Sequence, residues 1–201
     1  MRRFCRFADL TLFFSGISFR AMLAPSQTQT FLQAAQKGDA LAVEKLLRDV
    51  YPAVYRMALR LLAFNRAAAE DVAQETCLHI VKALVRYRGE ASFKTWALRI
   101  AMNCARDYGR SNRKYALQEP LDEELPDGQA LSGEDAAFQR QIWKEISLLP
   151  RDLREVCVLL WAEGYTQAET ARILDCAEKT IEWRVQAIKK RLREKLKGGQ
   201  G

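Results

Sequence analysis

The sequence has little of what metal, disulfide and catalytic proteins usually need. Its 201 residues include one histidine, His79, and five cysteines, an odd number without a C-x-x-C pair, so neither a zinc site nor a disulfide framework is indicated. No G-x-x-x-x-G-K-[ST], G-x-G-x-x-G or G-x-S-x-G motif occurs. We therefore expect no catalytic residue, metal, cofactor or small-molecule substrate. Free cysteines favour a reducing cytoplasm.

A long apolar run is also missing. The run from Leu10 to Ile17 has about eight residues, which is too short to span a bilayer, and Arg6, Asp9 and Arg20 flank it. It mimics a weak signal peptide. We favour a disordered extension over residues 1–29, with Met22 as a possible true start, and expect no stable membrane insertion.

Strand signals are absent as well, because apolar residues neither alternate nor flank Asn-Gly or Asp-Gly turns. From residue 30 the apolar spacing is helical, which predicts an all-α fold. Asp39 is expected to cap a helix that is bent or interrupted near Pro52, and a second helix should cover residues 70–86. A third should begin after Ser92 and bury Phe93, Trp96, Ile100 and Cys104. These helices make a first domain over residues 30–115.

The composition changes between Glu119 and Asp135, within a predicted linker over residues 116–135. The stretch EPLDEELPDGQALSGED holds seven carboxylates and no basic residue. Together with its prolines and glycines, this predicts a flexible acidic linker between two small helical domains.

The second domain, residues 136–197, carries a helix-turn-helix pattern. Thr166 and Glu169 form a capping box before one short helix, and residues 174–177 make the turn before a longer one. The longer helix should bury its apolar positions, which are Ile181, Val185, Ile188 and Leu192. It then projects Lys179, Thr180, Trp183 and Arg184, which could enter a major groove. The net charge of +7 and pI near 9.3 suit a polyanion such as nucleic acid, although a solvated basic face has the same pattern.

One stripe of the second predicted helix is unusual. Asp71, Gln74, Glu75 and Leu78 recur at i, i+3, i+4 and i+7, opposite Val72, Ala73, Cys77 and Ile80. An outward leucine beside carboxylates favours a protein interface, and a solvated face with one stray leucine is the alternative.

Six motifs resemble the sigma-70 family of bacterial transcription initiation factors, in its small extracytoplasmic-function (ECF) class. In the first domain they are E-D-V-A-Q-E-T at 70–76, Y-R-G-E-A-S-F-K-T-W at 87–96 and R-I-A-M-N at 99–103. In the second they are L-P-R-D-L-R-E-V at 149–156, E-G-Y-T-Q-A-E-T-A at 163–171 and K-T-I-E-W-R at 179–184. The resemblance covers roughly residues 30–195. It implies that region 2 binds the polymerase clamp and the minus-ten element, and that region 4 binds the flap and the minus-thirty-five element.

The resemblance also implies roles for single residues. Polymerase binding falls to Asp71, Gln74, Glu75 and Leu78. Minus-ten binding falls to Arg88, Gly89, Glu90, Arg99, Asn103, Arg106 and Arg110. Minus-thirty-five binding falls to Thr166, Lys179, Thr180, Trp183, Arg184, Lys189 and Lys190. The loop from Tyr87 to Ser92 matches the place where the family holds a flipped base, although Phe93 and Trp96 could instead be core.

The expected partners are core RNA polymerase and promoter DNA, and the resemblance adds an anti-sigma factor as a candidate. The acidic linker is either a solubilising tether or, by resemblance, a strand that runs near the RNA path. Glu182, Trp183 and Lys179 depart from the family pattern, so the promoter sequence does not transfer. A stand-alone helix-turn-helix regulator is the alternative function, and it would leave the stripe at Asp71 to Leu78 unexplained.

Overall fold

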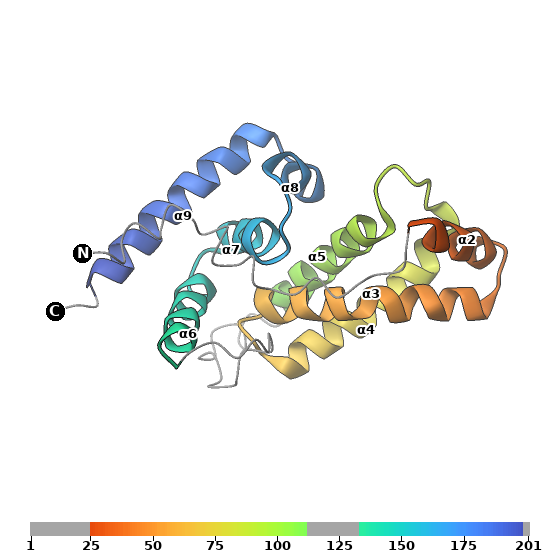
Figure 1. Ribbon diagram of the computed structural model, residues 1–201, viewed down its shortest axis with the longest axis horizontal. Helices are drawn as coiled ribbons and strands as arrows, with labels where there is room; N and C mark the ends of the chain where they lie inside the picture. Colours follow the sequence, from red (N-terminus) through yellow and green to blue (C-terminus); the bar gives the residue numbers. More distant parts are fainter. Residues whose placement is uncertain (1–24, 112–132, 199–201) are drawn as a thin grey trace. The chain divides into compact units, whose positions relative to one another are not determined.

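The computed structural model describes residues 25–111 and 133–198, which fall into two compact helical units (Figure 1). Within these ranges every regular element is a helix, which confirms the all-α prediction. The predicted linker lies almost wholly outside the described residues, as does most of the predicted N-terminal extension. No helix in the described ranges is long and apolar enough to cross a membrane.

The first unit is built around one long helix, α3. Its elements are α2 (Pro25–Gln36), α3 (Ala40–Leu61), α4 (Arg66–Ala83), the short 3-10 helix η2 (Leu84–Arg86) and α5 (Phe93–Ser111). Helix α3 packs against α2, α4 and α5, and α4 also packs against α5. Helix α2 starts at Pro25, five residues before the predicted domain boundary at residue 30.

Polar caps decide where these helices begin. The Asp39 carboxylate accepts hydrogen bonds from the backbone N–H groups of Leu41 and Ala42, as predicted, and Ser92 Oγ accepts one from Thr95 N at 3.1 Å. Asn65 caps α4 through Ala68 N, so this helix begins four residues before the predicted start at residue 70. Helix α3 continues through Pro52 without interruption.

The core of the first unit lies between α3, α4 and α5. Its largest fully buried side chains include Leu46, Met57, Ile80, Leu98 and Met102. The predicted buried face of α5 was partly wrong. Phe93 and Cys104 are buried, but Trp96 and Ile100 are only half-buried, and α5 instead buries Ala97, Leu98, Ala101, Met102 and Ala105. The small alanines allow α5 to approach its neighbours closely. A prediction based on the helical spacing of large apolar side chains does not identify such alanines as buried.

The second unit contains the helix-turn-helix. Its elements are α6 (Gly133–Ser147), α7 (Arg151–Cys157), a π-helical turn η3 (Val158–Ala162), α8 (Gln167–Leu174) and α9 (Glu178–Gly198). Gly164 ends the α7–η3 segment with φ 73°, a backbone conformation that favours glycine. The predicted inward residues of α9, Ile181, Val185, Ile188 and Leu192, are all buried.

Candidate functional site

The α4 stripe is the set Asp71, Gln74, Glu75 and Leu78, and all four side chains are exposed. Leu78 is 61% exposed, while Val72, Ala73 and Ile80 are buried on the opposite side of the helix. The structure therefore confirms the predicted division of α4 into two faces, with Cys77 half-buried at the boundary.

Two further apolar side chains were missed. Val81 is 43% exposed and Val85 73%, and they follow Leu78 at i+3 and i+7. The same helical spacing, extended past Leu78, would have found them. An exposed carboxylate and leucine surface with additional valines can bind a basic partner that also offers apolar contacts.

The loop from Tyr87 to Ser92, loop 87–92, joins η2 to α5. The Tyr87 hydroxyl donates to Ala91 O at 2.6 Å across the loop, and Gly89 has φ 76° at its tip. Arg88, Gly89 and Glu90 are exposed. The loop thus presents its polar centre to solvent while its ends are fixed.

Three aromatic rings gather below this loop. The Tyr87 ring centroid lies 5.0 Å from that of Trp96 and 6.0 Å from that of Phe93, and Phe93 and Trp96 are 5.7 Å apart. Phe93 is buried and serves as core, whereas Tyr87 and Trp96 are half-buried and so present part of their surfaces to solvent. Burial raises the pKa of Tyr87 above its ordinary value, in keeping with a protonated hydroxyl that donates to Ala91 O. The cluster can therefore offer aromatic surface for stacking.

The polar face of α5 follows the loop. Arg99, Asn103 and Arg110 are exposed and Arg106 is half-buried, so the four residues predicted at i, i+4, i+7 and i+11 share a face that reaches solvent. Asp107 forms an ion pair with Arg110 at the end of this face. The sequence interpretation overlooked Asp107, which places one carboxylate among the cations.

The start of α8 has the predicted capping box. Thr166 Oγ1 accepts a hydrogen bond from Glu169 N at 3.2 Å, and Thr166 N donates to Glu169 Oε2 at 2.9 Å. The backbone hydrogen bond from Thr166 lowers the pKa of Glu169, followed by the bond from its hydroxyl. Asp175 ends α8 in the left-handed region at φ 53°, and α9 begins at Glu178. These features confirm the predicted helix-turn-helix.

The first two turns of α9 expose most of the predicted side chains. Lys179 is exposed, Trp183 is 66% exposed and Thr180 is half-buried. Arg184 differs from the expectation that it projects, because its side chain is only 20% exposed and its Nε lies 3.6 Å from Asp152 Oδ2 on α7. Sequence spacing could not reveal this tertiary contact.

The distal part of α9 carries more cations. Lys190 and Arg193 are exposed, while Lys189 is half-buried. Among the described residues no group of three or more His, Cys, Asp or Glu side chains could hold a metal ion.

Both units match known family models. Sigma-70 region 2 matches residues 46–115, and Sigma-70, region 4 matches residues 139–192. The chain belongs to the sigma-70 family. Among its relatives are the ECF RNA polymerase sigma-E factor of Haemophilus influenzae, 26% identical over 84% of this chain and 94% of that protein, and the RNA polymerase sigma-H factor of Pseudomonas aeruginosa, 28% identical over 88% and 99%. These relatives place the chain in the ECF class.

Two solved structures are similar to this sigma-70 family member. CnrH in complex with the cytosolic domain of CnrY has a TM-score of 0.62 and 21% identity, covering 86% of this chain and 98% of that chain, and it shares the fold. The sigma factor RpoE in complex with the anti-sigma factor NepR from Bartonella quintana has a TM-score of 0.55 and 26% identity, covering 74% and 92%.

Proposed function

We propose that this ECF sigma factor binds core RNA polymerase, directs it to specific promoters and helps to separate the strands at the minus-ten element. The observation that carries the proposal is that one chain joins both sigma regions in order, with an exposed acidic and apolar stripe in the first and a helix-turn-helix in the second. A stand-alone regulator needs only the second of these.

The α4 stripe is proposed to bind the polymerase clamp. Asp71 and Glu75 suit a basic patch, since complementary charges speed encounter and disfavour wrong partners. Leu78, exposed within the stripe, supplies an apolar anchor that the partner can cover. The second unit is proposed to bind the polymerase flap.

Loop 87–92 and the polar face of α5 are proposed to bind the minus-ten element. A base that has left the stack can be held by aromatic surface and by polar groups at its edges, and the half-buried Tyr87 and Trp96 beside an exposed loop offer both. Arg99 and Arg110 then supply charge for the strand backbone. Strand separation of this kind is binding work, so we propose no catalytic activity.

Helix α9 is proposed to enter the major groove of the minus-thirty-five element with Lys179, Thr180, Trp183 and Arg184 near its N-terminal end. Thr166 supports this interface indirectly, because its hydroxyl is engaged with Glu169 and fixes the start of α8. Lys189 and Lys190 lie further along the helix and are proposed to attract phosphates.

The RpoE structure holds that sigma factor with an anti-sigma factor, so we include an anti-sigma factor among the candidate partners of this chain. Action on polymerase and promoter DNA places the protein in the cytoplasm.

A footprint with and without polymerase separates this function from a stand-alone regulator. Promoter fragments bound by the protein together with core polymerase should be protected at both elements. The protein alone should leave the minus-ten element unprotected, because the single strand that it captures forms only in the polymerase complex. Full operator protection by the protein alone would favour the regulator instead.

A further inference from the structure

Gln36, the last residue of α2, reaches the far end of α4. Its side-chain amide nitrogen donates to Tyr87 O at 2.9 Å and to Leu84 O at 3.2 Å. Leu84 is the first residue of η2, and its carbonyl also accepts the backbone N–H of Tyr87 at 3.1 Å. Tyr87 follows the last residue of η2, where main-chain oxygens no longer have regular intrahelical donors. A primary amide has two N–H groups, so one side chain can serve both oxygens. Helix α2 is thereby joined to the residue from which loop 87–92 departs.

The loop is fixed at three points. Gln36 holds its first carbonyl, the Tyr87 hydroxyl closes it by donating to Ala91 O, and Ser92 Oγ fixes its end as the cap of α5. Between these points Arg88, Gly89 and Glu90 remain exposed. Such a loop is ordered before it meets a ligand, so binding does not have to order it.

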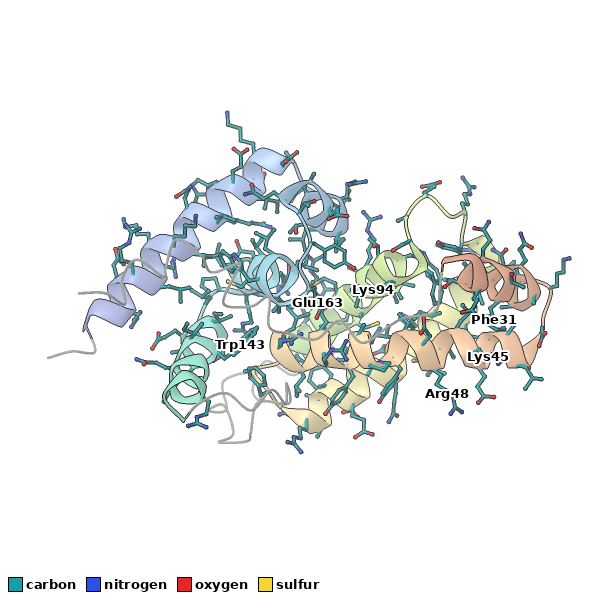
Figure 2. The ribbon with its side chains drawn as sticks, in the orientation of Figure 1. Phe31, Lys45, Arg48, Lys94, Trp143 and Glu163 are labelled. Atoms are coloured by element: carbon teal, nitrogen blue, oxygen red, sulfur yellow. The ribbon has the colours of Figure 1, made fainter. Side chains whose placement is uncertain are left out.

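Helix α2 packs mainly against α3 and has fewer contacts with η2. Ala35 is buried, and the Lys45 ammonium lies 4.9 Å from the centre of the Phe31 ring, which Figure 2 shows at the face between the two helices. Gly38, at φ 95°, and the Asp39 cap set the turn between α2 and α3. The position of Gln36 is therefore set mainly by the packing of α2 on α3 rather than by the loop that it fastens.

We propose that Gln36 is a positioning residue for base recognition at the minus-ten element. It holds loop 87–92 in the form that receives an unstacked base of single-stranded DNA. The inference rests on the proposed function and adds to it a helix that precedes the stretch matched by region 2, residues 46–115. Gln36 contacts the loop's backbone and not the base.

Two substitutions test the role, with one matched control. Gln36→Glu keeps the size of the side chain but replaces the donor with a carboxylate, and Gln36→Met removes the donor without adding charge. Gln33→Glu makes the same charge change at an exposed position on the same helix. Each full-length protein is combined with core polymerase and transcribes a promoter pool randomised at the minus-ten element. Sequencing the transcripts gives the preference for each base at each position.

Both Gln36 variants lose the hydrogen bonds to Leu84 O and Tyr87 O, and only the second of these holds the loop's first carbonyl. The preference at the captured base should therefore weaken by roughly 3- to 10-fold, the typical effect of losing one such bond. Polymerase affinity and preference at the other positions should stay as in the wild type, and Gln33→Glu should change neither. Preferences unchanged in both variants would overturn the inference. An equal loss of transcription from all promoter sequences, in proportion to a decrease in folded protein, would also overturn the inference. That result indicates a purely structural role.

Hydrogen exchange on the free protein gives a second measurement. The amides of residues 88–91 should exchange faster in Gln36→Met than in the wild type, whereas α9 amides should not change. Equal exchange in the loop would overturn the positioning role whatever the transcripts show. If the wild type initiates nowhere in the pool, the proposed function fails, and the exchange result still decides whether Gln36 orders the loop.

Discussion

Arg184 on α9 is joined to Asp152 on α7 by an ion pair, with 3.6 Å between Nε and Oδ2. The Arg184 side chain is 20% exposed, and that of Asp152 is 47% exposed. A guanidinium held at Nε keeps its terminal N–H groups for other acceptors. Asp152 therefore orients Arg184 at the recognition helix.

Arg184→Ala should weaken binding to the cognate minus-thirty-five element by about 1–3 kcal/mol and weaken binding to scrambled DNA less. Asp152→Ala should reduce the ratio of cognate to scrambled affinity without weakening the scrambled complex, because it removes orientation and also a negative charge near phosphates. Both are measured as holoenzyme affinities for the two DNAs. If Arg184→Ala weakens both DNAs by the same factor, the residue binds only a phosphate.

The distal cations of α9 should behave differently. Replacing Lys189, Lys190 and Arg193 by glutamine should weaken cognate and scrambled DNA about equally, since phosphate attraction carries no sequence information. The slope of log affinity against log salt should fall by roughly one unit for each phosphate that the variant no longer neutralises. Lys144→Gln removes one positive charge at an exposed position on α6 and serves as the control for each single lysine replacement. Weaker binding confined to cognate DNA would contradict this assignment.

Reversing the charges of the α4 stripe tests the polymerase interface. Asp71→Lys combined with Glu75→Lys should weaken core polymerase binding by several kcal/mol, because like charges then face each other across the interface. Helical content, measured by circular dichroism, should not change because both side chains are exposed. Glu44→Lys reverses a charge on the exposed surface of α3 and should leave the affinity intact. Wild-type affinity in the double variant would remove the clamp assignment.

The capping box of α8 should make stability depend on pH. Hydrogen bonds from Thr166 lower the folded-state pKa of Glu169 below that of the unfolded chain. Its contribution is therefore complete above the unfolded pKa and is lost as the pH falls through the folded pKa. Glu169→Gln should lower the free energy of unfolding of the second unit more at neutral pH than in acid below the folded pKa.

Denaturant titrations of the wild type and Glu169→Gln at the two pH values measure this difference. Thr166→Ala removes the hydroxyl and should cost about 1 kcal/mol at neutral pH, a typical value for an N-cap. If the free energies of unfolding of the wild type and Glu169→Gln differ by the same amount at both pH values, the carboxylate contributes nothing through its charge.

Local signals predicted much of this structure. The caps at Asp39, Ser92 and Thr166 depend on side chains that bond to backbone groups two or three residues away, so the sequence carries them directly. The α4 stripe follows from helical periodicity in the same way. Asn65 has the same capping chemistry, but the alanines that follow it show no helical spacing of large apolar residues. The predicted start of α4 at residue 70 is therefore four residues later than the observed start at Arg66.

Contacts between distant segments could not be predicted. Gln36 lies 48 and 51 residues from its two partners, and its single polar side chain gives no periodic signal. Arg184 and Asp152 are on different helices whose packing has to be known before the pair can be seen. The residue roles that come from the family resemblance, among them the minus-ten and minus-thirty-five contacts, remain predictions.

Run-off transcription tests the central claim most directly. Core polymerase, the wild-type protein and a pool of genomic promoter fragments should give discrete transcripts that core polymerase alone does not make. The Asp71→Lys, Glu75→Lys variant serves as the matched control and should give few transcripts, because the polymerase does not retain it. Discrete transcripts that require the α4 stripe are the predicted result, and no product from the wild-type protein would contradict the account.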